Sequence, residues 1–140
     1  MSEERTTPDL VGRTLSAYES ADRADYDALM SFFGADATWD MSPMGLGSYK
    51  EAASIRRFFE DWRGSYAEYE TEAEEVLELG NGITLAILVQ TGRPRGSDGH
   101  VQIRYAAVLQ WVDGLIVRVT NYSDASEARA AAERLAESTA

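Results

Sequence analysis

The stretch HVQIRYAAVLQWVDGLIVRVTNYSD, residues 100–124, predicts two long strands joined by a tight turn. From 101 to 111 the odd positions are apolar or aromatic, while the even positions include Gln102, Arg104 and Gln110. Alternation with a period of two is typical of a strand with one buried face, so we expect the odd face to point inward. The triplet VDG at 112–114 indicates a hairpin turn into a final strand.

Two further strands are predicted upstream of this hairpin. Residues 66–79 alternate and carry glutamates on one face, which we interpret as a solvated face. The triplet GNG at 80–82 is a strong hairpin signal, and the apolar run ITLAILVQTG at 83–92 predicts a mostly buried strand. The polar segment 93–99 then connects to residue 100, so four long antiparallel strands follow one another.

The first half of the chain predicts helices and one short strand. Thr7 and Pro8 are typical of an N-cap and first helical position, and apolar residues follow at helical spacing. We expect a second helix over 25–34 and a strand over 36–41. The tetrapeptide SYKE at 48–51 has the pattern of a capping box opening a third helix.

An alanine-rich helix is expected at the end of the chain, capped by Ser123 or Asp124. The order of elements predicts an α+β fold: a cone-shaped, curved antiparallel sheet with the N-terminal helices packed on its concave face. The space between sheet and helices is either filled with aromatic side chains or left open as a pocket.

Length and composition narrow the possible functions. The chain has 140 residues, which predicts one domain over residues 7–138, with flexible termini at 1–6 and 139–140. It has no cysteine and only one histidine, His100, so thiolate and multi-histidine metal sites are excluded, and we expect no cofactor. The net charge of −11 argues against nucleic acid. No signal peptide or membrane span is apparent, which predicts a cytoplasmic protein.

Four segments together resemble the SnoaL-like branch of the NTF2-like superfamily. They are ADYDALMSFFGADATWD (24–40), TGRPRGSDG (91–99), WVDGLIVRVTNYSD (111–124) and ASEARAAAERL (125–135). The resemblance covers residues 8–135 and implies the α+β roll described above, with an apolar small molecule bound in the cone. It also implies kinship with polyketide cyclases, ketosteroid isomerases and limonene-epoxide hydrolases, whose catalysis depends on a few polar groups in an apolar cavity.

At each position where those enzymes carry a proton-transferring group, this chain has a residue that does not transfer protons near pH 7. Asn121 occupies the place of an aspartate of the hydrolases and cyclases, and Gln90 that of a second carboxylate. Met41 matches the base of the isomerases, while the neighbouring Asp40 is expected on the opposite face, and Ala107 matches a histidine of the cyclases. An amide does not exchange a proton near pH 7 but still donates and accepts hydrogen bonds. The resemblance therefore implies a pocket that orients a ligand without an ordinary general base.

Three hypotheses remain open. In the first, the protein binds a small apolar molecule, with Tyr18, Gln90 and Asn121 as polar anchors, although Asn121 is also explained by a structural role at a strand end. The rest of the expected lining is Met30, Trp39, Met41, Phe58, Trp62, Tyr105 and Ala107. In the second, the protein is a cofactor-independent isomerase, cyclase or epoxide hydrolase acting on a polycyclic or terpenoid-like substrate. Asp40 would then be the base, and Tyr18 would polarise the substrate.

The third hypothesis is a structural protein whose cone is filled by its own side chains. In all three cases the outer face of the sheet is expected to pair two copies into a homodimer. The residues expected on that face are Gln102, Arg104, Val108, Gln110 and Arg118.

Overall fold

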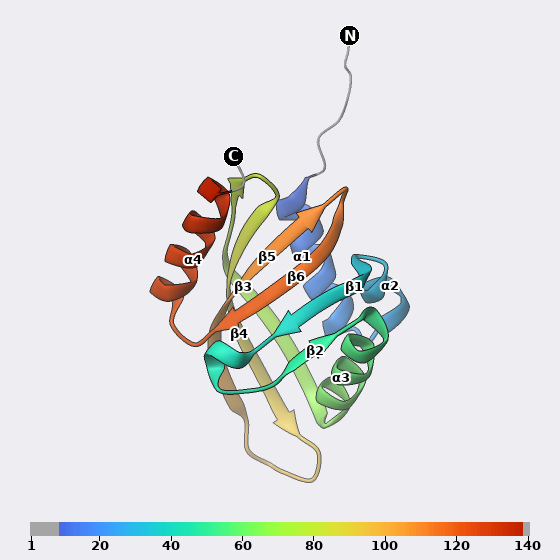
Figure 1. Ribbon diagram of the computed structural model, residues 1–140. Helices are drawn as coiled ribbons and strands as arrows, with labels where there is room; N and C mark the ends of the chain where they lie inside the picture. The colour runs from blue at the N-terminus through green and yellow to red at the C-terminus, as the bar shows by residue number, and fades with distance from the viewer. Residues whose placement is uncertain (1–8, 139–140) are drawn as a thin grey trace.

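A computed structural model of the chain describes residues 9–138 and shows a curved, unclosed six-stranded sheet with helices on both faces (Figure 1). The helices are α1 (Leu10–Asp22), α2 (Tyr26–Met30), α3 (Ala52–Gly64) and α4 (Ala125–Ser138), with a 3-10 turn η1 (Ser42–Met44). The strands are β1 (Phe33–Asp40), β2 (Ser48–Lys50), β3 (Tyr66–Gly80), β4 (Ile83–Pro94), β5 (Val101–Val112) and β6 (Leu115–Tyr122). The predicted α+β class and the four long C-terminal strands are confirmed.

The strand order is β2-β1-β6-β5-β4-β3. All neighbouring strands are antiparallel except β1 and β6, which run parallel, with Trp39 opposite Val119. The sequence analysis did not predict this parallel pair. This pairing joins segments that are distant in the chain and places Asp40 opposite Thr120 of the last strand.

Both predicted hairpin turns are present and depend on left-handed backbone conformations. Asn81 and Gly82 have φ values of 56° and 76°, and Asp113 and Gly114 have 54° and 80°. Two consecutive positive φ angles are the requirement of the tight turns that match strand twist, and Asn, Asp and Gly tolerate them best. These turns fix the registers of β3 with β4 and of β5 with β6.

The N-terminal elements differ from the prediction in three details. The N-cap of α1 within the described residues is Asp9, whose carboxylate accepts from the backbone N of Gly12 at 3.0 Å; Thr7 and Pro8 lie outside the described range. Helix α2 ends at Met30, so the predicted helix over 25–34 is too long. The predicted capping box at 48–51 is wrong, because Ser48 pairs with Asp40 in β2 and no side chain caps α3.

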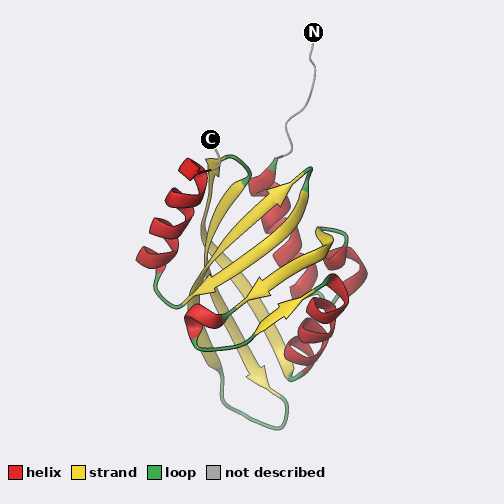
Figure 2. Cartoon of the chain, viewed as in Figure 1, coloured by secondary structure: helices red, strands yellow, loops and turns green. Residues whose placement is uncertain are grey.

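The inner core lies between the concave face of the sheet and helices α1, α2 and α3 (Figure 2). The inward residues of β5 are Tyr105, Ala107, Leu109 and Trp111, so the predicted odd face is confirmed. Trp39 of β1 packs edge-on against Phe59 of α3, with ring centroids 4.8 Å apart. Burial of these large rings is the main driving force that holds the helices on the sheet.

One buried hydrogen-bond network ties α1 to the floor of this core. The Thr14 hydroxyl donates to the Leu10 carbonyl at 2.7 Å and also contacts the Thr84 hydroxyl at 3.2 Å. Since Thr14 has a single proton, Thr84 donates to Thr14 and accepts from Trp111 Nε1 at 3.0 Å. Every donor of the network has an acceptor, as buried polar groups require.

A second, smaller core lies on the outer face of the sheet beneath α4. It consists mainly of Leu85, Ile87, Val108, Ala128 and Ala132. The carboxylate of Asp124 accepts from the backbone N of Ser126 and Glu127 at 2.7 and 3.2 Å, so the predicted cap is confirmed. Helix α4 therefore covers part of the face that was expected to be open, and Val108 is fully buried there.

Candidate functional site

A cavity lies on the inner face, between β1, β3, β4, β5 and β6 on one side and α3 and the turn after β1 on the other. Its lining is formed by Trp39, Met41, Met44, Leu46, Phe58, Phe59, Trp62, Tyr69, Gln90, Ile103, Tyr105 and Asn121. Aromatic and aliphatic side chains dominate this set, and none of its members is a carboxylate, a histidine or a basic residue. Such a lining favours a neutral, apolar guest.

The cavity is small as it stands. The volume that the centres of water-sized spheres can occupy is about 50 Å³. By that measure one water needs roughly 10–15 Å³, so the space has room for about four waters. A guest of one aromatic ring therefore requires part of the wall to move. The turn after β1 supplies Met44 and Leu46 to that wall, and Leu46 is half exposed.

Asn121 on β6 is one of two amides in the lining. It is 1% exposed and its Nδ2 donates to the backbone carbonyl of Asp40 at 3.4 Å. A carbonyl only accepts, so this contact identifies the amide nitrogen and leaves Oδ1 facing away from it. Asn121 Oδ1 is buried and has no hydrogen-bond partner within residues 9–138. The residue is thus both a structural amide at a strand end and an unused acceptor in the cavity wall.

In Gln90 on β4, the amide nitrogen is the atom without a partner, whereas in Asn121 it is the amide oxygen. Its Oε1 accepts from Trp62 Nε1 at 3.3 Å and from the Tyr69 hydroxyl at 3.0 Å. The indole N–H only donates, so the oxygen of the amide is identified and Nε2 is the free atom. Gln90 Nε2 is buried and has no partner in the described part of the chain. The lining therefore offers one unused acceptor at Asn121 and one unused donor at Gln90, and buried Trp39 Nε1 is a second unused donor.

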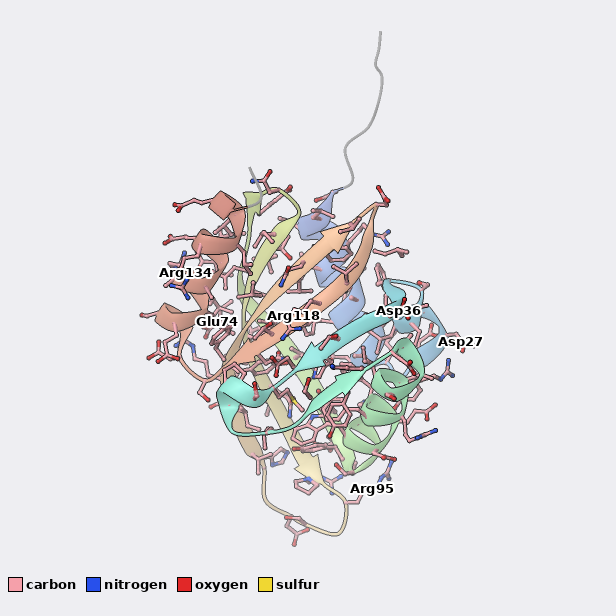
Figure 3. The ribbon with its side chains drawn as sticks, in the orientation of Figure 1. Asp27, Asp36, Glu74, Arg95, Arg118 and Arg134 are labelled. Atoms are coloured by element: carbon pink, nitrogen blue, oxygen red, sulfur yellow. The ribbon has the colours of Figure 1, made fainter. Side chains whose placement is uncertain are left out.

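Asp40 lies outside this cavity. It faces the outer side of the sheet, where its carboxylate accepts from Arg118 at 2.7 Å and from the backbone N of Ser42 at 2.9 Å. Arg118 is labelled on β6 in Figure 3. The hydrogen bond from Ser42 lowers the pKa of Asp40, and Arg118 acts in the same direction. Because the carboxylate is ionised, paired and on the wrong face, this placement is incompatible with the role of base for a guest in the cavity.

Three other expected site residues also lie outside the lining. Tyr18 of α1 packs deeper in the inner core, beside Ala17 and Leu29, and its buried hydroxyl has no partner among the described residues. Met30 packs at the edge of that core, and Ala107 is fully buried in β5 opposite Asn121. The seven expected residues that do line the cavity are Trp39, Met41, Phe58, Trp62, Gln90, Tyr105 and Asn121.

The tyrosines near the cavity remain protonated over the physiological range. Burial raises the pKa of Tyr69 to about 12 and raises that of Tyr105 well above its ordinary value. Burial likewise raises the pKa of Tyr18. These hydroxyls are therefore neutral donors or acceptors near pH 7 and cannot act as bases.

One carboxylate, Asp22 at the end of α1, lies behind these tyrosines. Burial raises its pKa despite the hydrogen bond from the backbone N of Thr71 at 2.9 Å, and Asp22 Oδ1 has no partner within residues 9–138. Asp22 is not part of the cavity lining.

The sequence analysis missed three lining residues, Leu46, Tyr69 and Ile103, and did not assign Met44 or Phe59 specifically to the site. Ile103 follows directly from the inward odd face of β5. Tyr69 lies on the side of β3 opposite the glutamates, so the alternation of 66–79 contained the signal. Leu46 lies between Gly45 and Gly47 in a loop, where no periodicity indicates direction.

Within residues 9–138, no group of three or more His, Cys, Asp or Glu side chains is placed to hold a metal ion. None of the described helices combines the length and apolarity that a membrane crossing requires.

Comparison with known proteins identifies the fold. The family model of the SnoaL-like domain matches residues 15–119. A candidate aromatic ring hydroxylase of Novosphingobium aromaticivorans superposes with a TM-score of 0.73 at 18% identity, covering 84% of this chain and 91% of that protein. An epoxide hydrolase of M. tuberculosis that is similar to limonene-epoxide hydrolase gives 0.70 at 14% identity, covering 89% of each chain.

A third structure comes from Catenulispora acidiphila and has a ketosteroid isomerase-like fold in complex with trimethylamine. It gives a TM-score of 0.70 at 16% identity, covering 84% of this chain and 86% of that one. No curated protein sequence matches the chain significantly. At these identities the structural likeness shows the fold alone.

Proposed function

The chain belongs to the SnoaL-like domain family, and from this premise we propose that it binds a small, mostly apolar molecule in the cavity between sheet and helices. The binding would proceed without an ordinary general acid and base. The observation that carries the proposal is the lining: aromatic and aliphatic walls with unpartnered polar atoms on Gln90 and Asn121. Buried polar atoms without partners are uncommon in folded proteins and are often explained by a ligand or water.

Binding requires a change of shape in the wall. The present volume of about 50 Å³ is smaller than a single aromatic ring needs. Met41 and Met44 have unbranched side chains that adapt to irregular guests. Leu46 is 50% exposed, so moving it outward costs little buried apolar area. We therefore expect the guest to enter past the turn that carries Met44 and Leu46.

An NMR titration with p-xylene tests this proposal. Amide shifts of β5 and of residues 41–47 should change in a saturable manner, while those of α4 on the outer face should not. Ile103 is partly exposed at the cavity wall, so Ile103→Phe should fill the space and weaken binding at least tenfold while the protein stays folded. The matched control is Val101→Phe, two residues earlier on the same strand and outside the lining.

A second candidate function is favoured by the same small volume. In this reading the cone is filled by its own side chains and the protein acts only as a structural unit. It predicts no saturable shifts with p-xylene and no molecule retained in native mass spectrometry of the purified protein. The catalytic reading, as isomerase, cyclase or epoxide hydrolase, receives no support from the lining, because Asp40 lies on the other face.

We also propose that the protein forms a homodimer through the part of the outer sheet face that α4 leaves open. Val112, Leu115 and Val117 are 55%, 38% and 39% exposed there. Gln110 and Arg118 lie opposite each other in the same β5–β6 ladder and supply polar groups beside this apolar patch. Analytical ultracentrifugation should give a dimer for the wild type and a monomer for Leu115→Glu, and a wild-type monomer contradicts the proposal.

A further inference from the structure

We propose that the cavity selects an uncharged guest carrying a hydrogen-bond acceptor at one end, for Gln90, and a hydrogen-bond donor at the other, for Asn121. A hydroxyaryl ketone is the simplest chemical class with this arrangement. The inference rests on the proposed binding function and adds to it the chemistry of the guest.

The polarity of each amide is set by a partner that has no choice of role. Asn121 must present its nitrogen to the Asp40 carbonyl, at 3.4 Å, because a carbonyl cannot donate. Gln90 must present its oxygen to Trp62 Nε1, at 3.3 Å, because an indole N–H cannot accept. Rotating either amide by half a turn would place like groups against each other. The free atoms of the two amides are therefore an acceptor on Asn121 and a donor on Gln90, both in residues at most 4% exposed.

The two amide residues lie far apart in the part of the sheet that lines the cavity. Gln90 is opposite Ile103 on β5, and Asn121 is opposite Ala107 on the same strand. Two strand spacings across the sheet and four residues along it separate the two Cα atoms by roughly 16 Å in a flat sheet. The concave curvature shortens this distance, but a hydrogen bond spans only about 2.9 Å. One functional group on the guest cannot contact both amides, so the guest needs a group at each end.

Tyr105 lies on β5 between Ile103, which is opposite Gln90, and Ala107, which is opposite Asn121, and it lines the cavity. Phe58 and Trp62 of α3 also line it and stack on each other with ring centroids 6.0 Å apart. In the proposed complex, a flat guest ring would pack among these aromatic side chains, with one substituent at Gln90 and the other at Asn121. In this proposal the aromatic walls orient the ring of the guest, and the two amides distinguish its functional groups.

The lining also selects against charge. The residues that form it include no Asp, Glu, His, Lys or Arg, and its tyrosines stay neutral near pH 7 because burial raises the pKa of Tyr69 to about 12. An ionised carboxylate or ammonium would lose its hydration without gaining a counter-charge. A carboxylate would in addition face the acceptor of Asn121. The favoured guest therefore combines a carbonyl and a hydroxyl rather than an acid or an amine.

Calorimetric titration with four ring compounds tests the inference. 4-Hydroxyacetophenone has both groups, 4-methoxyacetophenone lacks the donor, 4-ethylphenol lacks the carbonyl, and 4-hydroxybenzoate is charged. We expect the wild type to bind 4-hydroxyacetophenone about tenfold more tightly than either neutral analogue, since each comparison removes one buried hydrogen bond. The charged compound should bind at least tenfold more weakly than 4-hydroxyacetophenone.

Two near-isosteric variants assign each preference to its amide. Asn121→Leu should abolish the preference for hydroxyl over methoxy while keeping the preference for a carbonyl. Gln90→Met also frees the donors Trp62 Nε1 and the Tyr69 hydroxyl, so we expect the reverse pattern when it is combined with Trp62→Phe and Tyr69→Phe. General damage to the fold weakens all four compounds together and cannot produce this crossed pattern. Circular dichroism and thermal unfolding confirm that each variant is folded.

The possible outcomes are separable. Equal affinities for the three neutral compounds overturn the inference. It is also overturned if 4-hydroxybenzoate binds as tightly as 4-hydroxyacetophenone, or if both variants lose the same preference. If p-xylene still binds in those cases, the proposed function stands without the inference. If neither p-xylene nor any of the four compounds binds, the proposed function fails and the inference falls with it.

Discussion

Replacing Asn121 by aspartate tests whether the cavity is apolar and free of positive charge. The substitution keeps the size of the side chain and introduces a carboxyl group at a position that is 1% exposed. No basic residue belongs to the cavity lining, and Arg118 is engaged by Asp40 on the outer face at 2.7 Å. Desolvation without compensation should therefore raise the pKa of the new carboxyl by about 3 units from its value of about 3.9 in the unfolded chain.

The sign of the pH dependence follows from that direction. A carboxyl with a raised pKa binds its proton more tightly in the folded protein, so the free energy of unfolding falls as pH rises from the unfolded pKa through the folded one. The raised pKa should lower the free energy of unfolding by about 1.5 kcal/mol at pH 5 and about 3.7 kcal/mol at pH 7, which is a difference of roughly 2.2 kcal/mol between the two conditions. At low pH the protonated group can donate to the Asp40 carbonyl in place of the amide, which limits the remaining cost.

Urea unfolding of Asn121→Asp and wild type at pH 5 and pH 7 measures this difference. Asn121→Leu is the matched control, because it removes the same hydrogen bond without adding a titrating group. Its destabilisation relative to wild type should be the same at both pH values. If Asn121→Asp is destabilised equally at pH 5 and pH 7, the new carboxyl is solvated or paired, and the description of the cavity as apolar and free of positive charge is wrong.

Three further predictions concern other polar groups. Thr84→Val removes the acceptor of Trp111 Nε1 and should lower the free energy of unfolding by about 2 kcal/mol in urea titrations, whereas a loss below about 0.5 kcal/mol would show that the indole finds another partner. Burial raises the pKa of Asp22, so its contribution to stability should decline as pH rises through that raised pKa. Thermal unfolding of Asp22→Asn and wild type across pH 4–8 should show that the stability of the variant increases relative to wild type toward high pH. Asp40→Asn keeps an acceptor for the Ser42 backbone but weakens the pair with Arg118, so it should lower the free energy of unfolding by about 1 kcal/mol at pH 7. This deficit should vanish as pH falls through the lowered pKa of Asp40. The affinity for p-xylene should not change, and a loss of binding would show that Asp40 belongs to the site.

Much of the fold was predictable because it depends on local rules. The alternation of 101–111 predicted the inward residues of β5, and the turns at Asn81–Gly82 and Asp113–Gly114 need backbone angles that few residues tolerate. The parallel pairing of β1 with β6 was not predictable, since it joins segments distant in the chain and leaves no local pattern. The position of α4 on the outer face also depends on a tertiary choice, although Leu85 and Val108 are apolar on that side.

Part of the cavity lining was predictable, by two different routes. The inward direction of Tyr105 followed from the alternation of β5, whereas Gln90 and Asn121 were expected in the lining only from the family resemblance. The direction of Asp40, away from the cavity, followed from alternation along β1. Tyr18 was expected as an anchor from the family resemblance, yet its position on α1 places it outside the cavity lining, beside Ala17 and Leu29.

Part of the cavity wall belongs to the sheet and part belongs to a short turn. Both amides belong to strands in the middle of a hydrogen-bonded sheet, whereas Met44 and Leu46 belong to a short turn flanked by glycine. Substitutions in that turn can enlarge or reshape the chamber without disturbing the ladder that holds Gln90 and Asn121. Descendants of such a protein could thus exchange one guest for a bulkier or slimmer one while continuing to demand the same pair of functional groups.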